Sequence, residues 1–264
     1  MRHLLAAAVI ACGFGPAQAV EVFTQGFESD FAGFFDSTNG WHGTITLTDG
    51  TTEGVTPFQG SQFAVMTQVG TATATGPYTL FGGVSAIWPG GWTARAAVFI
   101  DTGWDDGSGF DWSVASSRQD GAHLRDFIFH VAQVGGDTRL SASNNSNFAP
   151  QVVAANAVTV GSGGWHVFEH VFRDDGGVLA VDMNVYDAAM ALIFSTTRSN
   201  PSDTIADVVG GNLYGWFTHI SVDGGIYVDG VSRSEAGVIP VPAAAPLLLS
   251  GLAAFAFLRR RRAA

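Results

Sequence analysis

The stretch WHVFEHVFRDDGGVLAVDMNVY, residues 165–186, predicts an antiparallel hairpin in the middle of the fold. In its second half every second side chain is large and apolar, which is the period of a strand with one buried face. These residues are Leu179, Val181, Met183 and Val185. The first half, residues 165–173, is apolar on both faces, and Asp-Asp-Gly-Gly at 174–177 supplies a tight turn between the halves.

Further short strands are expected on both sides of this hairpin. They fall at residues 43–49, 93–101, 125–134, 192–197, 213–222 and 226–232. The chain has 34 glycines to break these segments into short units, and it lacks a long Glu-, Lys- and Leu-rich stretch typical of a helix. The pattern predicts an all-β fold, with one domain at residues 20–234 built as a two-sheet sandwich.

Two segments resemble a known class of β-sandwich. Residues 163–181 are similar to a hairpin of the concanavalin/laminin-G-like jelly rolls, in which a tryptophan opens a strand whose partner follows a short acidic-Gly turn. The run IYVDG at 226–230 resembles their closing strand. The resemblance implies a jelly-roll topology and leaves the function open.

The N-terminus has the pattern of a secretory signal peptide. A short positive region precedes the apolar residues 4–11, and Ala-Gln-Ala at 17–19 is a cleavage pattern, so we expect residues 1–19 to be removed before Val20. An alternative is a lipoprotein signal that ends at Cys12. Cleavage after residue 19 removes the only cysteine, so the mature chain would have no disulfide. The secretion and signal-peptidase machinery are therefore expected partners.

Residues 239–264 form a three-part C-terminal pattern. From residue 239 to residue 258 the chain is uncharged, close to the about 20 residues that a spanning helix needs. Prolines interrupt its first third and leave residues 247–258 for a regular helix. The charges that follow favour the cytoplasmic side; they are Arg259, Arg260, Arg261 and Arg262. The segment is either a weak permanent anchor or a recognition tail that is cut.

This tail resembles the VPLPA variant of the PEP-CTERM sorting signals of Gram-negative bacteria. The motif falls on Ile239, Pro240, Val241, Pro242 and Ala243, with Ile and Val where Val and Leu are usual. The resemblance implies an exosortase-type membrane enzyme as a partner and a transient inner-membrane anchor. It also implies a final location at the cell surface or in the extracellular matrix, with residues 235–238 as the linker.

The charge of the body excludes one class of partner. The chain has no lysine, and residues 20–238 contain seven arginines against 23 acidic residues, a net charge of −16. Such a surface repels nucleic acid and favours divalent cations, so we expect no nucleic-acid binding.

An acidic segment after the strand at 93–101 suggests a calcium site. Four aspartates fall within 11 residues on an expected glycine-rich loop; they are Asp101, Asp105, Asp106 and Asp111. Calcium prefers several carboxylate and carbonyl oxygens on a flexible loop. The spacing is not that of an EF-hand, and the alternative is a solvated acidic loop that holds no metal.

The same segment carries two tryptophans, Trp104 and Trp112, and a second polar loop carries Asn144, Asn145 and Asn147. Sugar recognition combines a flat aromatic face with amide and carboxylate groups, so these residues are candidates for glycan binding. The alternative is that both tryptophans cap the ends of the sandwich. Trp165 and Trp216 fall in expected strands and are expected in the core.

Signatures of catalysis and of zinc binding are missing. His166 and His170 lie four apart on an expected strand, about 13 Å from one another, so they are interpreted as packed or partly exposed sheet histidines. The sequence has no alternating carboxylates of a jelly-roll glucanase, no Gly-x-Ser-x-Gly elbow and no phosphate-binding loop.

We therefore expect an exported, non-catalytic component of the cell surface or exopolysaccharide matrix that binds glycan. This role follows from the association of such tails with exopolysaccharide producers and from the Asp/Trp segment. The alternatives are a glycan-cleaving enzyme of jelly-roll fold and a purely structural surface protein.

Overall fold

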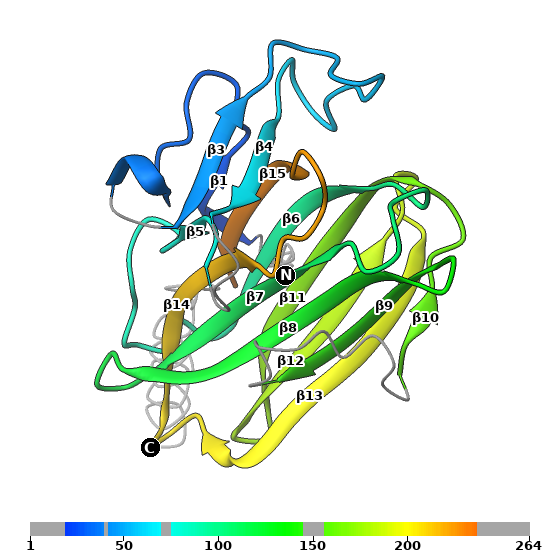
Figure 1. Cartoon of the computed structure of the whole chain (residues 1–264). Coiled ribbons are helices and arrows are strands. Elements are labelled where there is room, and N and C mark those ends of the chain that lie inside the picture. Colours follow the sequence, from blue (N-terminus) through cyan, green and yellow to red (C-terminus); the bar gives the residue numbers. More distant parts are fainter. Residues whose placement is uncertain (1–18, 40–41, 70–74, 145–155, 237–264) are drawn as a thin grey trace, which may run out of the picture. The chain divides into compact units, whose positions relative to one another are not determined.

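The computed structural model describes residues 19–39, 42–69, 75–144 and 156–236, which lie in one compact unit made of two antiparallel sheets (Figure 1). Residues 1–18 of the expected signal peptide, the sorting motif, the arginine cluster, Asn145 and Asn147 fall outside the described residues. Within the described ranges the helical structure is the 3-10 turn Ser37–Asn39, and no helix has the length and apolar character of a membrane span. The all-β, two-sheet prediction is confirmed for this unit.

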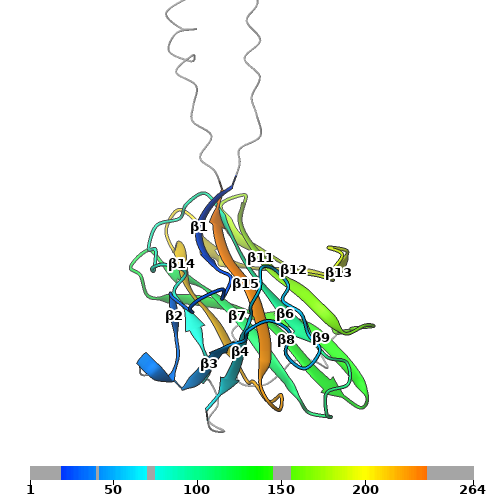
Figure 2. The same ribbon diagram turned by 90° about the horizontal axis from the view of Figure 1, so that it is seen from above.

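Sheet A has the strand order β13-β12-β11-β6-β15-β4-β3, with β1 also paired to β15. Its strands are β1 (Val20–Gln25), β3 (Gly43–Leu47), β4 (Ala64–Gln68), β6 (Trp92–Ile100), β11 (Gly164–Asp175), β12 (Val178–Tyr186), β13 (Leu192–Thr204) and β15 (Ile226–Glu235). Val20 is opposite Glu235, so the first and last described strands run side by side (Figure 2).

Sheet B has the order β10-β9-β8-β7-β14-β5-β2. Its strands are β2 (Phe34–Phe35), β5 (Tyr78–Thr79), β7 (Gly109–Arg118), β8 (His123–Val134), β9 (Asp137–Asn144), β10 (Val158–Thr159) and β14 (Val209–Thr218). The three long strands β7, β8 and β9 are consecutive neighbours, so residues opposite one another on these strands share one face of the sheet.

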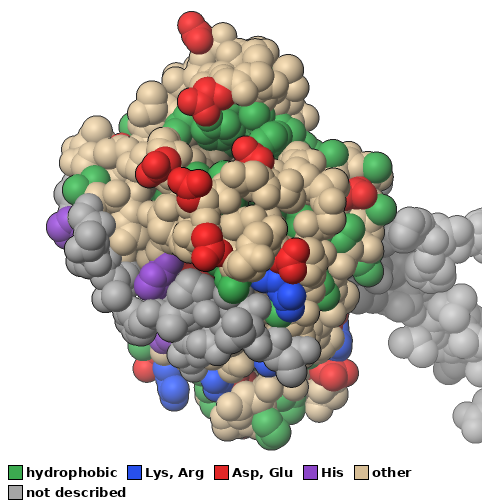
Figure 3. Space-filling view, turned by 45° about the vertical axis from the view of Figure 1, so that its right-hand side comes forward, with side chains coloured by type: hydrophobic (Ala, Val, Ile, Leu, Met, Phe, Trp, Pro, Cys, Tyr) green, Lys and Arg blue, Asp and Glu red, His purple; other side chains and the backbone are tan. Residues whose placement is uncertain are grey.

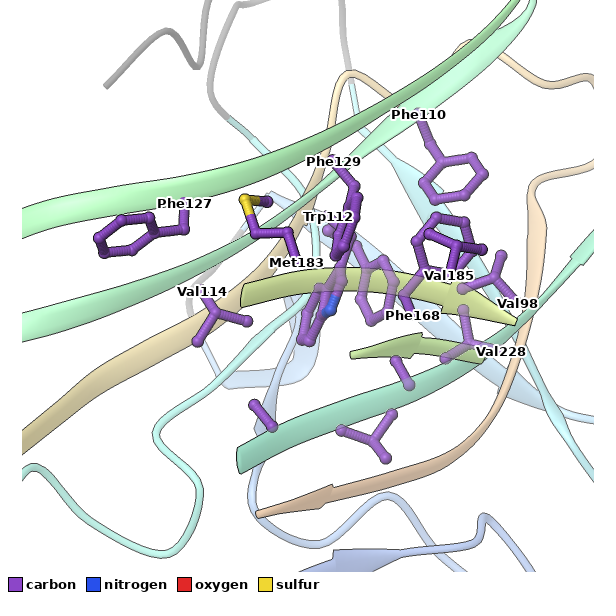
Figure 4. Packing of buried hydrophobic residues seen from close by; sticks show 14 of the residues in the cluster. Val98, Phe110, Trp112, Val114, Phe127, Phe129, Phe168, Met183, Val185 and Val228 are labelled. Carbon is purple, nitrogen blue, oxygen red and sulfur yellow. The ribbon is translucent and has the colours of Figure 1, made fainter. Parts of the chain in front are cut away.

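The predicted hairpin at 165–186 is confirmed as β11 and β12. Asp175 is opposite Val178, and the turn between them consists of Gly176 and Gly177 with φ of 66° and 92°. A two-residue turn with both φ values positive matches the twist of the flanking strands, and glycine adopts it without a steric penalty. The inward residues of β12 are fully buried, among them Met183 and Val185 in Figure 4.

The main core lies between the sheets. Phe110, Trp112 and Phe129 from sheet B meet Phe168 and Val185 from sheet A (Figure 4). A second apolar cluster covers the outer face of sheet A, where residues of the 48–63 segment lie against β6 and β11; it contains Val55, Phe63, Ala97, Trp165 and Val167. Trp165 is buried, but in this second cluster rather than between the sheets.

The observed strand pairing differs from the sequence-based prediction in the bounds of two strands and in the position of one tryptophan. Strand β7 lies where the loop bearing the aspartates was expected, and β14 ends at Thr218, four residues before the predicted end. Trp216 is opposite Ser113, on the outer face of sheet B, and is only half-buried, so its assignment to the core is wrong. Its Nε1 donates to the carbonyl of Gly76 at 3.1 Å. His166 and His170 are buried sheet residues as expected.

Candidate ligand-binding cleft

A cavity of about 230 Å³ lies on the outer face of sheet A, where β6 ends and β15 begins. It is lined by Glu53, Val55, Phe99, Asp101, Trp104, Val222, Asp223, Gly225 and Tyr227. Three of these side chains are aromatic and three are carboxylates. Among the described residues that line the cleft there is no lysine or arginine, so its charge is negative.

The floor of the cleft is a pair of aromatic rings. Phe99 on β6 is opposite Tyr227 on β15, and their ring centroids are 6.1 Å apart. Alternation along β6 turns Val98 and Ile100 into the core, so Phe99 faces outward. Trp165 on β11 contacts Phe99 edge-on, at 5.7 Å between centroids, and extends the same aromatic row.

One wall of the cleft is a two-residue hairpin tip. Thr52 and Val55 exchange two backbone hydrogen bonds, and Glu53 and Gly54 between them have φ of 51° and 81°. Holding a glutamate in this left-handed region costs about 1–3 kcal/mol, and such strained residues concentrate at functional sites. The turn places Glu53 over the floor, where its Oε2 accepts a hydrogen bond of 2.6 Å from the hydroxyl of Tyr227.

This hydrogen bond affects the ionisation of the phenol. Burial, followed by the hydrogen bond and charge of Glu53, raises the pKa of Tyr227 to about 12. A tyrosine of ordinary pKa is already protonated at neutral pH, and the raised pKa keeps the Tyr227 phenol protonated in more alkaline solution as well. Its one proton is donated to Glu53, so toward a ligand the phenol oxygen is an acceptor.

The opposite wall is the turn that follows β6. The Asp101 carboxylate accepts a hydrogen bond of 2.8 Å from the backbone N–H of Gly103, and the N–H of Trp104 reaches the Asp101 carbonyl at 3.3 Å. The Trp104 ring packs edge-on against Phe110 with centroids 6.3 Å apart. Because Trp104 is half-buried, one part of the ring anchors the turn in the core and the rest borders the cleft.

The four predicted calcium ligands do not lie on one loop. Asp101 borders the cleft, Asp105 is exposed, and Asp106 accepts a hydrogen bond of 2.6 Å from Gly135 in the β8–β9 turn. Asp111 is on β7 and fully buried, hydrogen-bonded to His130, so its placement on a loop is wrong. No three His, Cys, Asp or Glu side chains among the described residues come together as a metal-ion site.

The predicted glycan-binding residues that the structure describes do not lie together. Trp104 lies at the cleft, but Trp112 is fully buried and stacked on Phe217 at 4.1 Å, so it has no face to offer a ligand and its assignment is wrong. Asn144 ends β9 in sheet B, away from the strands that form the cleft. The alternation of side chains along β7 explains why Trp112 was misassigned. Trp112 lies two residues after Phe110 on the same strand, so both side chains point into the core.

Comparisons with known proteins add resemblances of fold. No family model and no curated protein matches the chain. Solved structures that resemble it include the carbohydrate esterase vb_24B_21 of the Shiga toxin-encoding bacteriophage phi24B, at 12% identity over 83% of this chain and 99% of that chain, with a TM-score of 0.47. The CBM2 module of the evolved Dit of Lactobacillus casei BL23 phage J-1 matches at 12% identity over 85% and 99%, with a TM-score of 0.44. A Lotus tetragonolobus seed lectin matches at 11% over 81% and 96%, with a TM-score of 0.42. At such identities and TM-scores these resemblances carry no argument about ligand or activity.

Proposed function

We propose that the protein is an exported β-sandwich of the concanavalin-like jelly-roll class that binds glycan in the cleft between Glu53 and Trp104. The observation that carries the proposal is the combination of ring faces, carboxylates and a protonated phenol in one concave site. Sugars present apolar C–H faces to aromatic rings and hydroxyl donors to carboxylates, so this chemistry suits them.

The size and charge of the cleft narrow the ligand class. Its volume of about 230 Å³ is below the about 300–1,000 Å³ of drug-sized sites, so it suits one sugar ring of a longer chain. Glu53, Asp101 and Asp223 give it negative charge without a compensating cation among the described lining residues. Such a site disfavours uronic acids and favours neutral sugars or amino sugars, whose ammonium group would pair with a carboxylate.

We propose that the cleft binds its ligand without cleaving it and that the protein acts in the exopolysaccharide matrix or at the cell surface. In this proposal an exosortase-type enzyme processes the tail near Pro242 and Ala243 after secretion. The tail lies outside the described residues, and the basis for this step is the sequence pattern. Peptide mass mapping of the extracellular protein tests it: retention of residues 259–262 would contradict cleavage and leave the tail as an anchor.

A glycan array probed with the purified protein, once in calcium and once in chelator, tests the binding function. We expect neutral or amino sugars to bind and uronic acids to fail. Trp104→Ala should weaken binding about tenfold, the equivalent of an aromatic contact of about 1.4 kcal/mol. Trp88→Ala is the matched control, because Trp88 is a half-buried tryptophan that lines a different cavity.

The outcomes of this screen test the location of the site, the presence of a metal and the glycan-binding function itself. Saturable binding that Trp104→Ala leaves unchanged would place the site elsewhere and overturn the cleft assignment. Loss of binding in chelator would add a metal to the site. Absence of binding to every glycan would remove the glycan function and favour a structural surface protein.

A further inference from the structure

A chain of three hydrogen-bonded side chains crosses the outer face of sheet B. Asp111 on β7, His130 on β8 and Ser143 on β9 come from three neighbouring strands. His130 Nδ1 lies 2.7 Å from Asp111 Oδ1, and His130 Nε2 lies 2.7 Å from Ser143 Oγ. The cleft is on the outer face of sheet A, so this chain of residues is a separate feature.

The register of the sheet brings these residues together. Asp111 is directly opposite His130 in the β7–β8 pair, and on β9 the residue opposite His130 is Ser141, two positions before Ser143. Residues two apart on a strand share a face, so Ser143 is the diagonal neighbour of His130. Phe110 and Trp112, which flank Asp111, point into the core, and this alternation sends the Asp111 carboxylate to the outer face.

The direction of these hydrogen bonds depends on the ionisation of Asp111. Burial raises the pKa of Asp111, and the hydrogen bond and charge of His130 act against that rise. When the carboxylate is ionised it can only accept, so Nδ1 of His130 donates to it and carries the ring proton. Nε2 is then an acceptor, and the hydroxyl of Ser143 donates to it. This is the arrangement in which an imidazole, oriented by a carboxylate, acts as general base for a serine hydroxyl.

The three hydrogen-bonded residues differ in burial. Asp111 and His130 are fully buried, whereas Ser143 is half-buried. Among the described residues the second carboxylate oxygen of Asp111, Oδ2, has no hydrogen-bond partner, so His130 is the group through which this carboxylate acts. Ser143 is therefore the member of the set that keeps exposed surface.

We propose that Ser143 is a nucleophile activated by His130 and Asp111, and that it reacts with unhindered carboxylic esters such as O-acetyl groups. This activity goes beyond glycan binding in the cleft and departs from the sequence-based expectation of a protein without catalysis. Because the base and the carboxylate are buried, only an acyl carbon that reaches Ser143 from the surface is attacked, which favours a small acyl group.

The reaction has two balanced steps. Ser143 Oγ forms a bond to the acyl carbon as its proton passes to His130 Nε2, and the alcohol leaves with that proton when its C–O bond breaks. Water then attacks the acyl-serine, gives a proton to His130, and releases the carboxylic acid as Ser143 recovers its proton. Asp111 holds the ring tautomer and stabilises the imidazolium in both steps.

A second serine on the same face of sheet B serves as a control for the activation of Ser143. Ser113 is also a buried serine beside an acid, but its hydroxyl donates directly to Asp126 at 3.0 Å. Asp126 further accepts a hydrogen bond from Tyr214 at 2.8 Å and contacts His123 Nε2 at 2.9 Å. The serine there has no imidazole between it and the carboxylate, so it should not be activated.

Labelling with a fluorophosphonate probe tests the proposal. We expect a covalent adduct on Ser143, located by peptide mass mapping, that Ser143→Ala abolishes and Ser113→Ala leaves in place. Loss of the general base in His130→Gln should slow labelling and p-nitrophenyl acetate hydrolysis by about 10²–10⁴-fold. Circular dichroism of each variant identifies any that fails to fold.

Two results would overturn the assignment. One is a folded protein without an adduct on Ser143. The other is a folded His130→Gln variant that labels as fast as the unmodified chain. Glycan binding is measured on the array and the reactive serine by the adduct on Ser143, so a failure of glycan binding and a failure of the reactive serine can be told apart.

Discussion

His170 is a buried histidine whose ionisation should govern stability in acid. Its ring packs against Phe129 at 4.7 Å between centroids and lies near Trp112 and Phe172. Nε2 lies 3.0 Å from the carbonyl of Phe127 and must carry the proton, because a carbonyl only accepts. Nδ1 is buried without a partner among the described residues, so a second proton there would bring an uncompensated charge into the core.

The magnitude follows from the shift in pKa. Desolvation lowers the pKa of His170 from 6.5 to about 3. The unfolded chain binds a proton below pH 6.5 and the folded chain does not, so the stabilisation is complete above pH 6.5 and is lost as the pH falls toward 3. At about 1.4 kcal/mol per pH unit the loss is about 2 kcal/mol at pH 5 and about 5 kcal/mol at pH 3, comparable with the whole stability of many domains.

His170→Gln isolates this effect because glutamine keeps an N–H donor and does not titrate. We expect the difference in free energy of unfolding between the original chain and the variant to shrink by about 1.4 kcal/mol per pH unit below 6.5. Urea unfolding followed by tryptophan fluorescence, from pH 7.5 to 4, measures it. A difference that stays constant over that range would refute the reasoning, and either His170 would be protonated in the fold or its pKa would be ordinary.

Two further perturbations test other parts of the sandwich by the same measurement. Burial, opposed by backbone hydrogen bonds, raises the pKa of Asp229 from 3.8 to about 6, so its contribution to stability falls by about 3 kcal/mol as the pH rises from 4 to 6. Asp229→Asn should remove that fall, and a wild-type–variant difference independent of pH would contradict it. Gly215→Ala should lower the free energy of unfolding by about 1–3 kcal/mol or more, because the added Cβ would lie 2.4 Å from the Phe81 ring and 2.5 Å from that of Trp112. Gly161→Ala, where nothing lies within 4 Å, is the control and should stay within about 0.5 kcal/mol; equal effects of the two substitutions would contradict the packing argument.

The parts of the fold that sequence predicts correctly are those encoded locally. The hairpin of β11 and β12 depends on alternation within nine residues and on two glycines at the turn, and both signals lie inside the segment that forms it. Strand β7 was missed although Phe110, Trp112 and Val114 alternate, because glycine and aspartate at its start are typical of loops. Propensity at the first residues of a strand is weaker than the pairing that β8 and β14 impose on it.

Of the cleft residues, the sequence predicted only those that lie close together in one segment of the chain. Asp101 and Trp104 were identified together because only two residues separate them. Glu53 lies 174 residues before Tyr227, and their hydrogen bond exists only because the 48–63 segment folds over β15. A carboxylate in a left-handed turn has no distinctive sequence signal, since Glu-Gly pairs occur in many loops. Contacts of this kind depend on the register of distant strands, which one sequence does not reveal.

The misplacement of Asp111 has the largest chemical consequence. On a loop, its carboxylate would be judged with its sequence neighbours Asp105 and Asp106, and calcium would be the natural ligand. On β7 its neighbours are set by the ladder, and the residue across it is His130, 19 positions away. The same carboxylate therefore changes from a candidate metal ligand to the group that orients an imidazole toward Ser143. Sequence motifs for hydrolases fail to report such a set because they describe serines on turns before helices, whereas here three antiparallel strands supply one residue each. Convergent serine–histidine–aspartate sets are recognised by geometry and by the roles of the groups, and at this site the strand register supplies the geometry.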